Sequence, residues 1–204
     1  MTATAKRVVV FISGGGSNML ALAKAAAAPD FPADIVAVIS DKADVGGLAK
    51  AEALGIATHV FVRKDYDSKD AHEAAILSRL EALSPDIICL AGYMRLLSGA
   101  FISAYEGRII NIHPSLLPAY PGLHTHQRAI DAGETQAGCT VHFVTEGMDE
   151  GPVILQARVP VIAGDTAETL AARVLVEEHK AYPAALRMVA EGKVRMVDGK
   201  AVRI

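Results

Sequence analysis

The chain has 204 residues and a formal net charge of −3, with 51% hydrophobic and 21% charged residues. These values are ordinary for a folded globular protein and exclude an intrinsically disordered chain. The sequence contains no block of Lys or Arg, so a nucleic-acid partner is not expected, although a small phosphorylated ligand can bind to backbone amides. We also find no apolar stretch long enough for a membrane span and no signal-peptide pattern at the N-terminus.

Cysteine and histidine spacing gives no sign of a metal site. Cys89 and Cys139 are the only cysteines, and they form neither a disulfide framework nor a zinc-type motif. His124 and His126 stand at the start of a predicted helix, where two residues two apart point in different directions. We therefore expect no bound metal and a reducing, cytoplasmic location. No repeat or linker interrupts the sequence, so a single domain over residues 1–204 is the simplest organisation.

The first half of the sequence alternates short apolar runs with helical patterns. The predicted strands are residues 7–13, 34–40, 57–62, 86–91 and 108–113. The predicted helices are residues 18–28, 46–54, 71–83 and 94–105. Strands that alternate with helices usually form a parallel sheet with right-handed crossovers. The sequence therefore predicts an α/β fold with a Rossmann-like, mostly parallel twisted sheet flanked by helices.

The second half of the sequence has a different pattern. Predicted strands at residues 138–144 and 153–161 have no helix of useful length between them, which favours antiparallel pairing in the C-terminal part of the fold. Residues 166–191 read as a long helix that Pro183 should kink or split. Asp198 and Gly199 separate two short runs at the end of the sequence and indicate a small hairpin.

Residues 13–18, Ser-Gly-Gly-Gly-Ser-Asn, join the first predicted strand to the first predicted helix. Glycines allow close backbone approach, and the amides and dipole of a helix N-terminus favour a bound phosphate. Ser17 and Asn18 would add side-chain donors. Two alternatives stay open. One is a dinucleotide site, for which Asp41 could bind a ribose but Met19 replaces the usual third glycine, and the other is a purely structural turn.

The most informative segment is residues 111–122, Asn-Ile-His-Pro-Ser-Leu-Leu-Pro-Ala-Tyr-Pro-Gly. Because side chains alternate along a strand, Asn111 and His113 should point to the same side, and Pro114 should end the strand. An amide donor and an imidazolium can stabilise the oxyanion that forms when an amine attacks a formyl carbon, and imidazole can also transfer protons near neutral pH. The alternative for His113 is a structural histidine at a strand end.

An acid beside the imidazole would favour its charged form. The loop at residues 145–152 supplies the candidates, of which Asp149 is the best placed. Glu146 and Glu150 are the other acids within reach, and a solvated loop acid without a catalytic role is the alternative for Asp149 itself.

Residues 111–122, together with the loop of Asp149, closely resemble the family of folate-dependent formyltransferases that act on glycinamide ribonucleotide. The resemblance runs in collinear order from the glycine turn to about Pro183. It implies an enzyme of de novo purine biosynthesis that transfers a formyl group from 10-formyltetrahydrofolate to the amine of glycinamide ribonucleotide. Both partners would be small molecules, no membrane or nucleic acid would be involved, and the protein would be a monomer or a homodimer.

The resemblance also implies roles for individual residues. The catalytic residues would be His113 as proton donor, Asn111 as oxyanion partner and Asp149 as the acid that favours the charged histidine. The substrate phosphate and ribose would be bound by Gly16, Ser17, Asn18 and Glu178. The cofactor-binding residues would be Lys69, Met94, Arg95, Leu96, Leu97, Asn111 and Val144.

Two positions depart from the family pattern, and one assignment has a structural alternative. Lys69 stands where the family has an arginine for the glutamate tail of the folate, so the charge is kept but the bidentate fork is lost. Leu175 replaces a polar phosphate contact that is frequent in the family. Residues 94–97 are apolar enough to belong to the core instead of a pterin site.

Three other functions are weighed against formyl transfer to the ribonucleotide. A formyltetrahydrofolate hydrolase would use water as the acceptor, but in that family another histidine stands where this chain has Pro114. A transfer-RNA formyltransferase would be expected to carry a further basic domain. A nucleotide-sensing module on the same scaffold would not need Asn111, His113 and Asp149 together.

Overall fold

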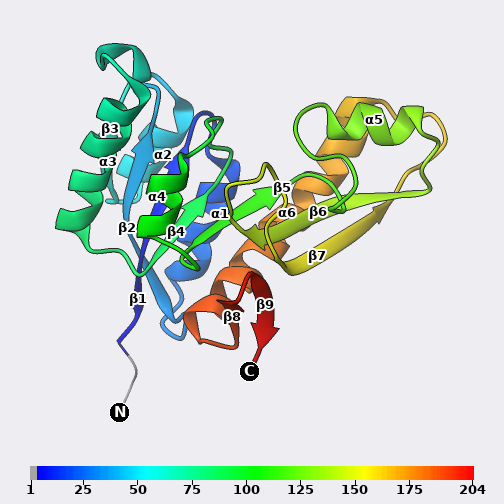
Figure 1. Ribbon diagram of the computed structural model, residues 1–204. Helices are drawn as coiled ribbons and strands as arrows, with labels where there is room; N and C mark the ends of the chain where they lie inside the picture. The colour runs from blue at the N-terminus through cyan, green and yellow to red at the C-terminus, as the bar shows by residue number, and fades with distance from the viewer. Residues whose placement is uncertain (1–3) are drawn as a thin grey trace.

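The computed structural model describes residues 4–204, which form a seven-stranded sheet with helices on both faces and a separate two-stranded hairpin (Figure 1). The strands of the large sheet are β1 (Lys6–Ile12), β2 (Ala33–Ser40), β3 (Ala57–Val60), β4 (Ile87–Leu90), β5 (Ile109–His113), β6 (Gln136–Phe143) and β7 (Val153–Pro160). The helices are α1 (Ser17–Ala26), α2 (Gly46–Ala53), the 3-10 turn η1 (Arg63–Asp65), α3 (Lys69–Leu83), α4 (Gly99–Ala104), α5 (Thr125–Asp131) and α6 (Ala167–Ala190).

The strand order of the large sheet is β3-β2-β1-β4-β5-β6-β7. The first five strands in this order are parallel, while β6 pairs with β5, and β7 with β6, in antiparallel fashion. The prediction of a mostly parallel α/β sheet with antiparallel strands in its C-terminal part is therefore confirmed. The hairpin of β8 (Val194–Val197) and β9 (Lys200–Arg203) is also confirmed, because Asp198 and Gly199 both have positive φ in its turn.

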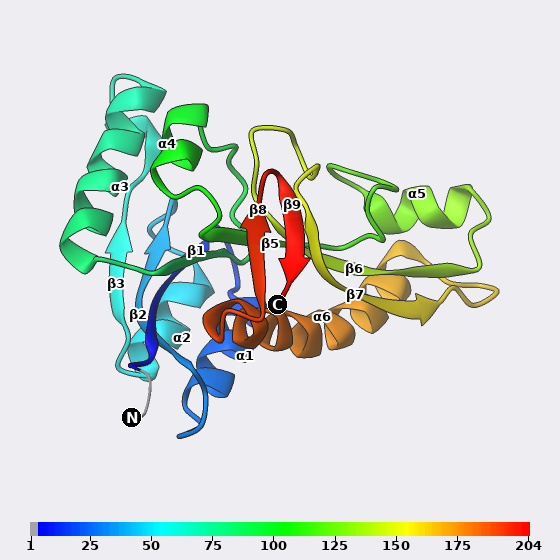
Figure 2. The same ribbon diagram turned by 60° about the horizontal axis from the view of Figure 1, so that its bottom comes forward.

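Alternation along β1 explains why both faces of the sheet are covered. Val8, Val10 and Ile12 are fully buried and belong to the cluster formed with α1, α2 and α6. Val9 and Phe11 point to the other face and pack with α3 and α4. A strand that is apolar on both faces needs helices on both sides, which is the three-layer arrangement visible in Figure 2.

The predicted helix at residues 94–105 is wrong in its first half. The helix α4 begins only at Gly99, after Ser98, whose hydroxyl accepts a hydrogen bond from the Phe101 amide at 3.2 Å. Buried Glu73 on α3 accepts hydrogen bonds from both the amide and the hydroxyl of Ser98. These tertiary contacts hold residues 93–98 in an extended loop, which local apolarity alone could not reveal.

Helix α6 crosses the sheet as one continuous element of 24 residues, so Pro183 does not split it. Tyr182 and Leu186 are fully buried on either side of the proline and anchor both halves of the helix to the core. The Tyr182 hydroxyl lies 2.9 Å from the carbonyl oxygen of Leu90 and 3.1 Å from that of Ile110. These contacts fix α6 under β4 and β5. None of the helices formed by residues 4–204 combines the length and apolarity of a membrane span.

Candidate active site

Most of the predicted site residues come from the carboxyl ends of β1, β4 and β5, while Lys69 and Glu178 are on α3 and α6 and two more follow β6. The chain leaves β1 toward β2 on one side and later returns to place β4 on the other side of β1. Open α/β sheets bind ligands at such a switch point, because the loops after neighbouring strands diverge there and leave a crevice. The sheet topology therefore brings the glycine turn after β1 and the loop after β4 to the same edge.

The glycine turn has the geometry of an anion cradle. Gly16 precedes α1 with φ 67°, and no side chain caps the helix. The turn packs closely on α2, because the amide of Gly47 donates to the carbonyl of Gly14 at 3.1 Å and the Lys50 ammonium donates to the carbonyl of Gly15 at 2.7 Å. The uncapped amides at the start of α1 can therefore serve an anion.

Asn18 and Glu178 form a buried pair between α1 and α6. The Asn18 amide donates one N–H to the Glu178 carboxylate at 2.7 Å, so its second N–H and its backbone amide are what it could offer to a phosphate. Burial raises the pKa of Glu178, while the Asn18 hydrogen bond and the charge of His113 act in the opposite direction. The hydrogen bond from Asn18 to Glu178 thus links the glycine turn to α6.

His113 sits between two hydrogen-bond acceptors. Its Nδ1 atom lies 3.4 Å from the Asp149 carboxylate, and its Nε2 atom lies 2.9 Å from the carbonyl oxygen of Tyr120. Both partners can only accept hydrogen bonds, so either ring nitrogen can donate to the acceptor that it faces. The same carboxylate oxygen of Asp149 accepts the amide of Gly122 at 2.8 Å, which holds the two loops together. Glu146 and Glu150, the alternative acids, are exposed.

Asn111 has a partner that the sequence did not single out. His142 lies directly opposite Asn111 in the antiparallel ladder of β5 and β6, with its Nε2 atom 3.2 Å from the Asn111 amide nitrogen. The Nδ1 atom of His142 lies 2.8 Å from the carbonyl oxygen of Phe143, so the proton belongs on Nδ1 and Nε2 accepts from Asn111. Burial lowers the pKa of His142, which keeps this ring neutral.

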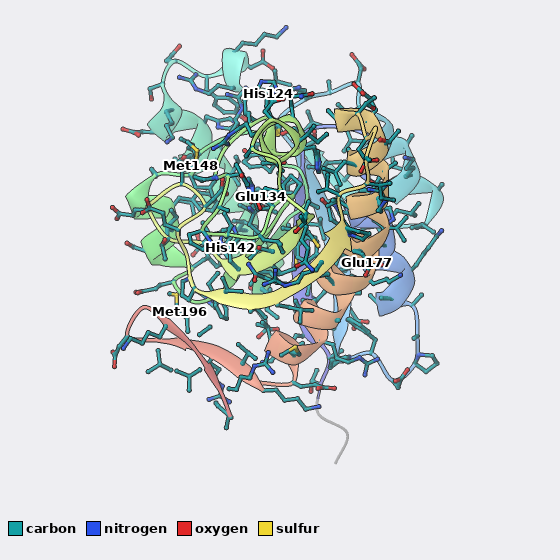
Figure 3. The ribbon with its side chains drawn as sticks, turned by 90° about the vertical axis from the view of Figure 1, so that its right-hand side faces the viewer. His124, Glu134, His142, Met148, Glu177 and Met196 are labelled. Atoms are coloured by element: carbon teal, nitrogen blue, oxygen red, sulfur yellow. The ribbon has the colours of Figure 1, made fainter. Side chains whose placement is uncertain are left out.

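His142 could have been found from the sequence by pairing the two predicted strands, but the register was not known. It also lies 3.8 Å from the Asp149 carboxylate, so one acid faces both histidines. Figure 3 shows His142 close to the loop that carries Met148. The structure thus brings Asn111, His113 and Asp149 together as predicted and adds His142 to the group.

A hollow of about 100 Å³ opens beside these side chains. It is lined by most of the residues predicted to bind the folate, namely Arg95, Leu96, Leu97, Asn111 and Val144, and by His142 and Asp149. Two predicted residues lie outside this lining. Met94 is exposed, and Lys69 is on α3 with its ammonium 3.7 Å from Glu73, the residue that holds Ser98. A larger cavity, of about 220 Å³, lies behind residues 114–120 and contains none of the predicted site residues.

Asp41 does not have the free carboxylate that a dinucleotide site would require. The Ser13 hydroxyl donates to one carboxylate oxygen at 2.5 Å, and Arg95 donates to the other at 2.7 Å. Met19, which stands in place of the third glycine of a dinucleotide turn, is fully buried against the core. The geometry therefore favours a phosphate monoester over a dinucleotide at this turn.

Comparison with known proteins agrees with this geometry. Residues 6–186 match the family described as formyl transferase. The chain is 46% identical over 194 residues to the phosphoribosylglycinamide formyltransferase of Escherichia coli (strain K12), covering 95% of this chain and 92% of that protein. It is 53% identical over 190 residues to the trifunctional purine biosynthetic protein adenosine-3 of Bos taurus, covering 93% of this chain but only 19% of that protein. The crystal structure of phosphoribosylglycinamide formyltransferase from Brucella melitensis superposes with a TM-score of 0.90 at 70% identity, covering 96% of this chain and 100% of that one.

Proposed function

Because the chain belongs to the formyl transferase family, we propose that it transfers a formyl group from 10-formyltetrahydrofolate to the amine of glycinamide ribonucleotide, a step of de novo purine biosynthesis. Relatives that match nearly the whole chain carry this activity in their names. The observation that carries the proposal within this molecule is the convergence of Asn111, His113 and Asp149 beside an apolar hollow and next to an anion cradle.

The two ends of the site suit the two substrates. The uncapped start of α1, at Gly16, Ser17 and the backbone of Asn18, would hold the phosphate of the ribonucleotide, and Glu178 would accept a hydrogen bond from a ribose hydroxyl. The hollow lined by residues 95–97 and Val144 would receive the flat, largely apolar pterin. The amine and the formyl carbon would then meet at Asn111 and His113, between the two binding regions.

The reaction forms one carbon–nitrogen bond and breaks another. The lone pair of the substrate amine attacks the formyl carbon, and the carbonyl oxygen gains the negative charge. One N–H of the Asn111 amide donates to His142, so the second N–H is left to donate to this oxyanion. When the intermediate collapses, the folate nitrogen leaves with a proton from His113, and the proton that the amine nitrogen loses would return to the His113 ring.

His113 would donate a proton, and Asp149 would stabilise the positive charge of the ring before the donation. Asp149 at Nδ1 and His142 beside Asn111 orient these two side chains, which leaves Nε2 of His113, 2.9 Å from the Tyr120 carbonyl, as the nitrogen that would give its proton to the substrate. The proposed steps use only side chains of the chain itself.

Tetrahydrofolate release from formyl-folate, measured with and without glycinamide ribonucleotide, tests the proposal. We expect release only when the ribonucleotide is present. His113→Ala should lower the rate at saturating substrates by a factor of roughly 10² or more and leave ribonucleotide affinity, measured by calorimetry, nearly unchanged. Release without the amine would instead identify a hydrolase, binding of the ribonucleotide without release would identify a sensor, and full activity of His113→Ala would remove this residue from the mechanism.

Several expectations from the sequence stay predictions alongside this proposal. They are a cytoplasmic location, a monomeric or homodimeric state, the absence of a nucleic-acid partner and of a metal, a single formyltransferase domain, and the contact of Lys69 with the folate tail.

A further inference from the structure

Ser13 is the residue at which the two binding regions of the site meet. It follows β1 directly and begins the glycine turn, and it is 5% exposed. Its amide donates to the carbonyl of Gly92 at 3.2 Å, and its hydroxyl accepts the amide of Met94 at 2.8 Å. The first residue of the phosphate turn is therefore bonded twice to the loop that leads into the folate hollow.

Asp41 extends this connection to the side chain of Arg95. It follows β2, is 2% exposed, and accepts from the Ser13 hydroxyl with one oxygen and from the Arg95 guanidinium with the other. Arg95 is itself part of the lining of the hollow, and its side chain is 39% exposed. A buried carboxylate thus joins the turn after β1 to the loop after β4, although neither segment needs it for its own secondary structure.

From these contacts we infer that Ser13 and Asp41 are positioning residues that couple the two binding regions, so that ribonucleotide at the glycine turn strengthens folate binding at residues 93–97, and the reverse. This inference rests on the proposed function. The physical basis is that an anion bound at Gly16 and Ser17 would hold the turn that begins at Ser13, whose hydroxyl contacts the Met94 amide and, through Asp41, holds Arg95 in the lining of the hollow. Coupling between two sites is necessarily reciprocal.

A role in coupling differs from a structural role in what it changes. A network that only stabilised the fold would alter the melting temperature and leave the ratio of affinities with and without the second ligand unchanged. A network that positions one subsite in response to the other changes that ratio. The ratio can be measured without chemistry, because tetrahydrofolate lacks the formyl group and cannot be used up in the presence of ribonucleotide.

The test is the dissociation constant of tetrahydrofolate, measured by calorimetry with and without saturating glycinamide ribonucleotide. In the wild type we expect the ribonucleotide to lower this constant at least about fivefold, the lower end of typical couplings. Asp41→Asn keeps an oxygen that can accept from Ser13 but removes the ion pair with Arg95. The Arg95 guanidinium can still be hydrated by solvent, because its side chain is 39% exposed. This variant should lower the coupling to less than about twofold and change each affinity alone by less than about threefold.

Two further variants make the result decisive. Asp165→Asn breaks a comparable ion pair, with Arg173 at 2.7 Å, which has no contact with Ser13, Asp41 or Arg95, and this variant should keep the wild-type coupling. Ser13→Ala removes the hydroxyl bridge and keeps the ion pair between Asp41 and Arg95, and it decides the question if Asp41→Asn fails to fold. The inference is overturned if the ribonucleotide changes the tetrahydrofolate dissociation constant of the wild type less than twofold. It is also overturned if the folded Ser13 and Asp41 variants keep a fivefold change. A wild type that binds neither ligand and transfers no formyl group overturns the proposed function as well, whereas normal transfer with unaltered coupling in the variants overturns this inference alone.

Discussion

Replacing Asp149 by Asn removes one charge from the centre of the site and changes almost nothing else. Asp149 has φ 56°, in the left-handed region that Asn tolerates nearly as well as Asp. The side chains have the same shape, and the amide oxygen of Asn can still accept the hydrogen bond that the Gly122 amide now donates at 2.8 Å. The loop should therefore keep its conformation, and the variant isolates the effect of the carboxylate charge on His113.

The magnitude follows from the loss of the carboxylate charge. The carboxylate lies 3.4 Å from Nδ1 of His113, and its side chain is only 13% exposed. We take the contribution of this charge to be similar to that in hydrogen bonds to charged groups, about 1.5–3 kcal/mol. If that stabilisation supports the imidazolium in the transition state, its loss corresponds to a fall in kcat/KM of about 10- to 150-fold. Ribonucleotide affinity should not change, because the residues proposed to contact the phosphate and the ribose are on α1 and α6.

The assay is the initial rate of tetrahydrofolate release at saturating ribonucleotide, with calorimetric affinities for both ligands. Glu150→Gln is the matched control, because it makes the same charge change one residue further along the loop at an exposed position. We expect the control to remain within about twofold of the wild type. A rate for Asp149→Asn within threefold of the wild type would refute the assignment of this acid to His113.

Two further predictions test the ribonucleotide end of the site. Gly16→Ala should lower the free energy of unfolding, measured in urea, by about 2 kcal/mol or more, because φ is 67° and the new Cβ would lie 2.8 Å from the Gly47 backbone. Gly15→Ala is the control and should cost much less, because its new Cβ would have no atom within 4 Å. Equal losses in the two variants would contradict this account of the turn. Because burial raises the folded-state pKa of Glu178 above its ordinary 4.5, the native state binds more protons in that window and should lose stability as pH rises through it. Glu178→Gln should remove this loss. The free energy of unfolding of the variant minus that of the wild type should therefore be larger at pH 7 than at pH 4. If this difference does not change with pH, the assignment is contradicted.

The sequence alone determined the layered fold and the chemistry at the end of β5. Strands such as β1 are apolar on both faces, which requires helices on both sides, and the spacing of Asn111 and His113 forces both side chains to the same side of one strand. These properties depend on local periodicity, so they can be predicted without knowledge of the tertiary structure.

Only the tertiary structure decided which distant residues complete the site. The register of β5 and β6 makes His142 the partner of Asn111. The side chain of Asn18 donates a hydrogen bond to Glu178, which is 160 residues further along the sequence. Residues 93–98 remained a loop because Glu73 and Ser13 hold them there, against an apolar pattern that predicts a helix. Asp41 was bonded to Ser13 and Arg95 instead of being left to bind a ligand. Each of these outcomes depends on contacts between segments far apart in the chain, whose distances no local pattern encodes.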